Sequence, residues 1–114
     1  MPAGRLLLVA QETDLRHSLV FALETDGFSV TLRDAPPTLS WLAQNHFDCT
    51  IVDQKAFTGA VHENIAFCVK AHPVVLLAAQ PHTGLLPWVA QAIDLPLDGS
   101  DVTSAVRHAL HLDA

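Results

Sequence analysis

Short apolar runs alternate with longer amphipathic segments along the chain, and this alternation restricts the fold more than any other feature. The longer segments repeat apolar residues at every third or fourth position, which is the period of a helix with one buried face. Runs that are apolar throughout are expected to be covered on both sides, as parallel strands are between two helical layers. The sequence therefore predicts an α/β fold with a doubly wound parallel sheet. The runs that indicate strands are Arg5–Ala10, Ser29–Arg33, Cys49–Asp53, Val74–Ala78 and a weaker Ala92–Leu95.

Four helices are expected between and after these runs. The first begins near Thr13 and Asp14 and ends before Gly27, because glycine easily adopts the left-handed conformation that follows a helix. The second is expected to open at residues 34–37 with its two prolines in the first turn, where a missing N–H costs nothing. The apolar faces of the last three helices are predicted to be Leu39, Leu42, Ala43 and His46; Val61, Ile65, Cys68 and Val69; and Val102, Ala105, Val106, Ala109 and Leu110.

The composition fits one compact domain, residues 1–114. Hydrophobic residues make up 50% and charged residues 16% of the chain, against roughly 25% charged in an average globular domain. The net charge of −6 argues against direct binding to nucleic acid or to an anionic membrane. The apolar run Leu6–Ala10 is too short for a signal peptide or a membrane span, so a cytoplasmic protein is expected. Cys49 and Cys68 lack CxxC spacing and are expected to be buried thiols.

Polar residues follow two of the predicted strands, at the edge where functional groups collect in such sheets. Six segments along the chain share a recognisable pattern: Arg5-Leu-Leu-Leu-Val9, Asp14-Leu15-Arg16, Leu23-Glu-Thr-Asp-Gly-Phe-Ser-Val30, Phe47-Asp-Cys-Thr-Ile-Val-Asp53, Pro73-Val-Val-Leu-Leu77 and Pro96. In their order and spacing the chain resembles the receiver domain of bacterial two-component response regulators, over residues 5–110. The resemblance implies the flavodoxin-like, CheY-like fold, with five parallel strands in the order 2-1-3-4-5 and three α/β/α layers.

The metal and phosphoacceptor positions of that family match this chain in part. In receivers, an acid pair after the first strand and an aspartate ending the third hold one Mg²⁺, which neutralises the incoming phosphoryl group. The matching residues here are Gln11 and Glu12 for the pair and Asp53 for the acceptor. The resemblance thus implies Asp53 as the phosphoacceptor candidate, and Glu12 with Asp53 as a weak Mg²⁺ candidate. No cofactor is expected to be required.

The remaining positions of the family's phosphorylation pattern are degenerate. Ala78 stands where the family has a Thr or Ser, Leu95 where it has a Lys, and Ala92 where it has an aromatic switch residue. Losing the lysine and the hydroxyl removes roughly 3–6 kcal/mol of phosphoryl stabilisation, at about 1.5–3 kcal/mol for each charge-assisted hydrogen bond. We therefore expect no catalytic residue and no enzymatic activity.

The segment between the fourth and fifth predicted strands is crowded with apolar side chains. Pro87 permits at most a short or kinked helix. On so small an element Leu85, Leu86, Trp88 and Val89 cannot all face inward, and we predict that they form a partner surface. The alternative is a compact turn that fills the core. The expected partner is a protein: a signalling component, an output domain or a second copy in a homodimer.

Together these features predict a degenerate receiver that acts in a bacterial phosphorelay through phosphorylation-independent protein–protein interaction. Two alternatives remain open at this point. One is an unorthodox phospho-accepting receiver that uses Asp53. The other is a small-molecule sensor that uses the crevice at the strand ends. No output domain is recognised in the sequence, so any regulated activity is expected on another chain or beyond this end; the partner and the input signal do not follow from the sequence.

Overall fold

The strands form one parallel sheet of five, with the order β2-β1-β3-β4-β5. The computed structural model describes residues 4–94 and 99–111. The predicted α/β fold with strand order 2-1-3-4-5 is confirmed. The strands are β1 (Gly4–Val9), β2 (Phe28–Arg33), β3 (Cys49–Asp53), β4 (Val74–Leu77) and β5 (Gln91–Ile93).

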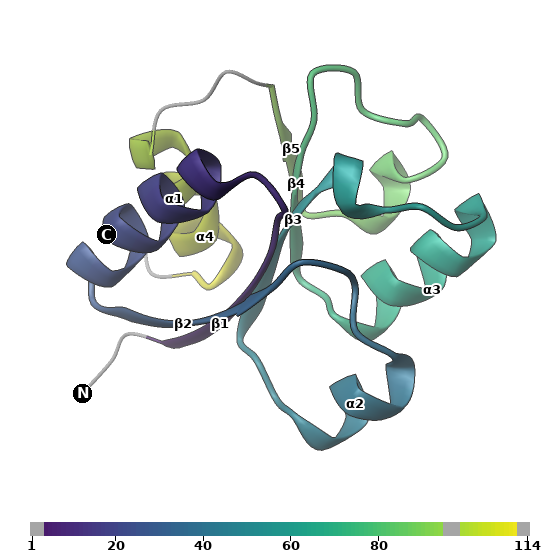
Figure 1. The fold of residues 1–114 in the computed structure, drawn as a ribbon, viewed down its shortest axis with the longest axis horizontal. Coiled ribbons are helices and arrows are strands. Elements are labelled where there is room, and N and C mark those ends of the chain that lie inside the picture. Colours follow the sequence, from purple (N-terminus) through teal and green to yellow (C-terminus); the bar gives the residue numbers. More distant parts are fainter. Residues whose placement is uncertain (1–3, 95–98, 112–114) are drawn as a thin grey trace.

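Helices cover both faces of this sheet and complete three layers. Figure 1 shows the sheet nearly edge-on, with α1 and α4 on one side and α2 and α3 on the other. Their bounds are α1 (Thr13–Thr25), α2 (Leu39–Gln44), α3 (Val61–Lys70) and α4 (Gly99–Ala109), and two 3₁₀ turns are η1 (Gln54–Ala56) and η2 (Leu86–Trp88). Within the described ranges, no helix is both long enough and apolar enough to cross a membrane.

Two apolar cores lie on the two faces of the sheet, and β1 contributes to both. Leu6 and Leu8 pack into the core under α1 and α4, whereas Leu7 and Val9 pack into the core under α2 and α3. All four side chains are fully buried. Alternate residues of a strand face opposite sides of a sheet, so a run that is apolar throughout can supply two cores at once.

Helix α1 has the predicted bounds, but α2 begins later than predicted. Gly27 follows α1 with φ 96°, the left-handed conformation expected there. The prolines at 36 and 37 were predicted inside the first turn of the second helix, and this is wrong because that helix starts at Leu39. Thr38 is its N-cap, and its hydroxyl oxygen accepts a 3.1 Å hydrogen bond from the backbone N of Trp41. A residue that precedes proline avoids the helical conformation, so the two prolines delay the helix until this cap.

The buried face of α3 is narrower than predicted. Cys68 is buried and Ile65 is half-buried, but Val61 and Val69 are 40% and 48% exposed. Phe67 is buried beside Cys68 instead. The neighbouring elements α2 and η2 have only six and three residues, too few to cover both ends of a ten-residue helix.

The crossover between β4 and β5 contains a single 3₁₀ turn, η2, with Pro87 in its middle. Pro87 lacks a backbone N–H and cannot continue an α-helix, so a short element is what its position predicts. Strand β5 spans Gln91–Ile93 and begins one residue before the predicted start. Leu95, the predicted end of that strand, lies outside the described residues.

Candidate functional site

Four of the predicted site residues lie at the carboxyl ends of the neighbouring strands β1, β3 and β4: Gln11, Glu12, Asp53 and Ala78. Val9 of β1 pairs with Val52 of β3, so the loop that leaves β1 borders the end of β3. Asp53, the last residue of β3, pairs with Leu77, the last residue of β4. Ala78 directly follows Leu77, so it borders Asp53 on the side of β3 that faces away from β1.

Asp53 is almost fully buried, with 4% of its surface exposed. Its Oδ1 accepts a 3.0 Å hydrogen bond from the backbone N of Lys55, so it is the N-cap of η1. This bond satisfies an N–H that the start of a helical turn leaves without a partner. Asp53 thus has a structural role that needs no phosphoryl group. The side chain of Lys55 is exposed.

Gln11 and Glu12 are exposed in the loop after β1. Glu12 occupies the N-cap position of α1, but its side chain makes no capping hydrogen bond. Mg²⁺ needs near-octahedral oxygen ligands, usually with more than one carboxylate. In the described part of the chain, no group of three or more His, Cys, Asp or Glu residues could hold a metal ion. Glu12 and the capping residue Asp53 therefore form a donor set that fits Mg²⁺ poorly.

Two positions that carry a hydroxyl and an aromatic ring in receivers are alanines here, and both pack against neighbouring parts of the protein. Ala78 is 4% exposed, and its backbone N donates to the O of Ile93 at 3.0 Å, which ties the end of β4 to β5. Ala92 packs against the core under α2 and α3. Neither side chain can donate a hydrogen bond to an anion at the sheet edge. The lysine position, Leu95, lies outside the described residues.

Gln54 joins the end of β3 to the segment after β4. Its Nε2 donates to the backbone O of Gln80 at 3.0 Å, and its Oε1 accepts from the backbone N of His82 at 2.8 Å. We call this pair of hydrogen bonds the Gln54 clasp. Its partners are backbone atoms 26 and 28 residues along the chain, so no residue pattern in the sequence indicates the contact.

The predicted partner surface is exposed in part. Leu86 and Trp88 are 43% and 47% exposed and Val89 is half-buried, but Leu85 is only 2% exposed. Assigning Leu85 to the surface was therefore wrong, because the tight turn directs it into the core under α2 and α3.

A shallow hollow of about 380 Å³ lies where η2 meets the end of α3 and the start of β4. Trp88 lines it together with Val69, which is 48% exposed and was predicted to be on the buried face of its helix. We call the lining residues the Trp88 surface; they are Cys68, Val69, His72, Pro73, Val74, Pro87, Trp88, Val89 and Ala90. None of them is Asp, Glu, Lys or Arg. Leu86 belongs to the same turn but does not line this hollow.

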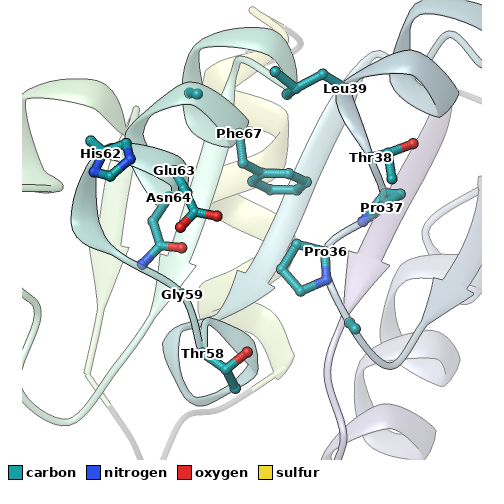
Figure 2. Close-up of a pocket in the computed structure, with 12 residues that line it drawn as sticks. Pro36, Pro37, Thr38, Leu39, Thr58, Gly59, His62, Glu63, Asn64 and Phe67 are labelled. Carbon is teal, nitrogen blue, oxygen red and sulfur yellow. The ribbon is translucent and has the colours of Figure 1, made fainter.

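A groove of about 470 Å³ lies between α3 and the segment that leads into α2. Figure 2 shows Pro36 and Phe67 on its opposite walls, with Glu63 along α3. The Oε1 of Glu63 already accepts a 3.3 Å hydrogen bond from the backbone N of Ala60. Throughout the described ranges, every buried side-chain N or O atom has a hydrogen-bond partner. The groove therefore has space for a small ligand but no buried polar group left over to orient one.

Both cysteines are free and buried, as predicted. Burial raises the pKa of the Cys49 thiol from its ordinary value of 9.0 to about 12. Burial likewise raises the pKa of the Cys68 thiol to about 11. Because the thiolate is the reactive form, neither side chain suits nucleophilic or redox chemistry near neutral pH.

The structure is similar to those of response-regulator receiver domains. A putative response regulator from Chloroflexus aurantiacus superimposes with a TM-score of 0.78 at 20% identity, covering 97% of this chain and 99% of that one. The receiver domain of the sensor histidine kinase PA1611 from Pseudomonas aeruginosa, with magnesium in its active-site cleft, gives 0.77 at 13% identity, covering 95% and 98%. Full-length FixJ from B. japonicum gives 0.72 at 19% identity over 97% of this chain, which spans only 59% of FixJ.

These likenesses show that the chain has the receiver fold. Comparison of the sequence alone finds no matching family model and no matching curated protein.

Proposed function

We propose that the chain is a receiver-like domain of bacterial two-component signalling that acts by binding a protein without being phosphorylated. The receiver fold supports the general role. The observation that carries the finer proposal is the packing at the sheet edge, where Asp53 is buried as a turn cap and Ala78 replaces the hydroxyl beside it.

The energetics favour this proposal over a phospho-accepting domain. A phosphoryl group on Asp53 would place negative charge at an almost fully buried position next to Ala78. Each missing charge-assisted hydrogen bond withholds about 1.5–3 kcal/mol from that group. An unorthodox acceptor is therefore the second choice.

The Trp88 surface is where we propose that the partner binds, and its chemistry fits a second copy of this chain. Two such surfaces would meet without an Asp, Glu, Lys or Arg side chain between them, so no ion pair of these residues needs to be desolvated. In a twofold pair, the half-exposed Trp88 of each copy can fill the hollow of the other. Repulsion between two chains of net charge −6 is screened over about 8 Å at physiological salt. Another signalling protein at this surface is the alternative outcome.

The groove of Figure 2 gives the small-molecule alternative a place but little support. Specific small-molecule sites combine apolar walls with a few polar groups that fix the ligand's orientation. Glu63, a polar residue of this groove, is already used to hold the start of α3. We therefore rank sensing of a small molecule below protein binding.

The proposal is tested by adding Mg²⁺ with acetyl phosphate, and separately with beryllofluoride, while intact mass and backbone NMR shifts are followed. We expect no stable phosphoryl adduct, no shift changes at residues 79–90, and Mg²⁺ binding no tighter than about 1 mM, because few carboxylates face the ion. The matched control is Asp53→Asn. An adduct present in the parent and absent in this variant, with shift changes that reach Trp88, would favour the phospho-accepting alternative instead.

A further inference from the structure

We propose that Gln54 is the positioning residue that holds the Trp88 surface in its binding conformation. The residue after Asp53 would then govern this surface through a side-chain amide and without a phosphoryl group. The inference rests on the proposed function of the Trp88 surface, and it adds the means by which that surface is kept in place.

The chemistry of the clasp leaves one orientation for the Gln54 amide. The backbone N–H of His82 can only donate and the backbone O of Gln80 can only accept, so Oε1 must face His82 and Nε2 must face Gln80. At 2.8 Å and 3.0 Å both bonds have ordinary hydrogen-bond lengths. One side chain therefore fixes two points of the segment that follows β4.

Burial does little to hold that segment. Of residues 79–84, four are exposed and the other two are only half-buried. Burial that could fix the chain begins at Leu85, which is 2% exposed. The far end is fixed separately, by the backbone N of Ala90 donating to the O of Val74 at 2.8 Å. The stretch between β4 and Leu85 thus depends on the clasp for its position.

A chain of hydrogen bonds leads from the clasp to Trp88. Nδ1 of His82 accepts from the backbone N of Gly84 at 3.0 Å, and the backbone O of His82 accepts from the N of Leu85 at 2.9 Å. The O of Leu85 in turn accepts from the N of Trp88 at 2.9 Å. Moving His82 would therefore disturb the turn that carries Trp88.

Asp53 supports the clasp by capping the turn that carries Gln54. Its bond to Lys55 N shapes η1, and Gln54 is the first residue of that turn. The carboxylate that serves as phosphoacceptor in receivers here helps to aim the neighbouring amide. An asparagine at position 53 offers the same Oδ1 acceptor, whereas an alanine offers none.

The experiment uses the full chain with Trp41→Phe, which leaves Trp88 as the single tryptophan, since the chain has two. Gln54→Met keeps the length of the side chain and removes both hydrogen bonds. We expect amide exchange at His82 to accelerate about three- to tenfold, as for loss of one ordinary hydrogen bond. Acrylamide quenching of Trp88, measured on monomer at low concentration, should rise toward that of free tryptophan, and self-association should weaken.

Two further variants separate positioning from general stability. Gln80→Met makes the same side-chain change at a residue that takes part in the clasp only through its backbone O. It should leave amide exchange at His82 and quenching of Trp88 unchanged. Gln54→Glu keeps an acceptor for His82 but loses the donor to Gln80, and should fall between the parent and Gln54→Met.

The outcomes distinguish this inference from the proposed function. Unchanged exchange at His82 and unchanged quenching in Gln54→Met would overturn the inference, as would an increase in exchange spread evenly over the whole chain. Beryllofluoride with Mg²⁺ should leave Trp88 quenching in the Trp41→Phe chain unaltered. A change there would contradict the proposed function, while the result for the clasp variants would still decide the role of Gln54.

Discussion

The two faces of the sheet are covered to different degrees. On one face α1 and α4, with 13 and 11 residues, pack against each other and are tied by an ion pair between Arg107 and Asp26 at 3.2 Å. On the other face, α2 and η2 have only six and three residues. Five of the six large apolar side chains exposed in the described ranges belong to this second face: Leu39, Val61, Val69, Leu86 and Trp88. The first face is the more completely covered, and the second leaves apolar surface exposed, where we propose that a partner binds.

The largest expected difference between the faces is in stability. Leu23→Ala on α1 removes a fully buried side chain from the first core and should lower the free energy of unfolding by about 3 kcal/mol. The same substitution at Leu86, which is 43% exposed, should cost less than about 1 kcal/mol. Urea denaturation of the two variants checks this. Equal losses would mean that Leu86 contributes as much to folding as Leu23, contrary to its exposure.

A smaller difference is expected between the two buried thiols, one in each core. Cys49 has a pKa of about 12, and Cys68, which lines the hollow of the Trp88 surface, has a pKa of about 11. One pKa unit changes the thiolate fraction tenfold, but the less basic thiolate is also the weaker nucleophile, so Cys68 should react about three- to tenfold faster with a thiol reagent at pH 8. The single-thiol variants Cys49→Ala and Cys68→Ala measure each rate under native conditions. Equal rates would show that the hollow gives no access to the second core.

The third effect concerns the loops at the carboxyl edge, which hydrogen bonds hold in place. Asp53→Ala removes the cap of η1 and should cost about 1 kcal/mol, whereas Asp53→Asn should stay within a few tenths because it keeps the acceptor. Thermal unfolding of both variants gives the comparison. If both substitutions were equally costly, the negative charge of Asp53 would matter more than its hydrogen bond.

Much of the first face and of the sheet could be predicted from local patterns. Apolar runs that supply two cores are visible in the sequence as uninterrupted strands, and Gly27 marks the end of α1 by its conformational freedom. The second face was harder to predict because its elements are short. Either the prolines or Thr38 could mark the start of α2. The capping bond from Trp41 N to Thr38 decides for Thr38, and the pattern of apolar residues does not show this bond.

The site could be predicted only at positions where the chemistry of one side chain decides what the residue can do. An alanine side chain has no hydroxyl in any fold. Once the chain is compared with the receiver pattern, Ala78 therefore shows that this position cannot donate a hydrogen bond to a phosphoryl group. Which of the residues around Pro87 is buried depends on the geometry of one turn, and the assignment of Leu85 to the surface failed for that reason. Gln54 acts through backbone atoms distant in sequence, and only the folded chain brings them together.

Light scattering over a range of protein concentrations shows whether the second face binds without a phosphoryl group, as we propose. The unmodified chain should form dimers, and Asp53→Asn should do the same. Trp88→Ala should weaken the dimer about thirtyfold, the equivalent of roughly 2 kcal/mol for a tryptophan anchor, while its circular dichroism and melting stay near those of the parent. Dimers that form only after beryllofluoride and Mg²⁺ are added, or that are lost in Asp53→Asn and kept in Trp88→Ala, would contradict the proposal.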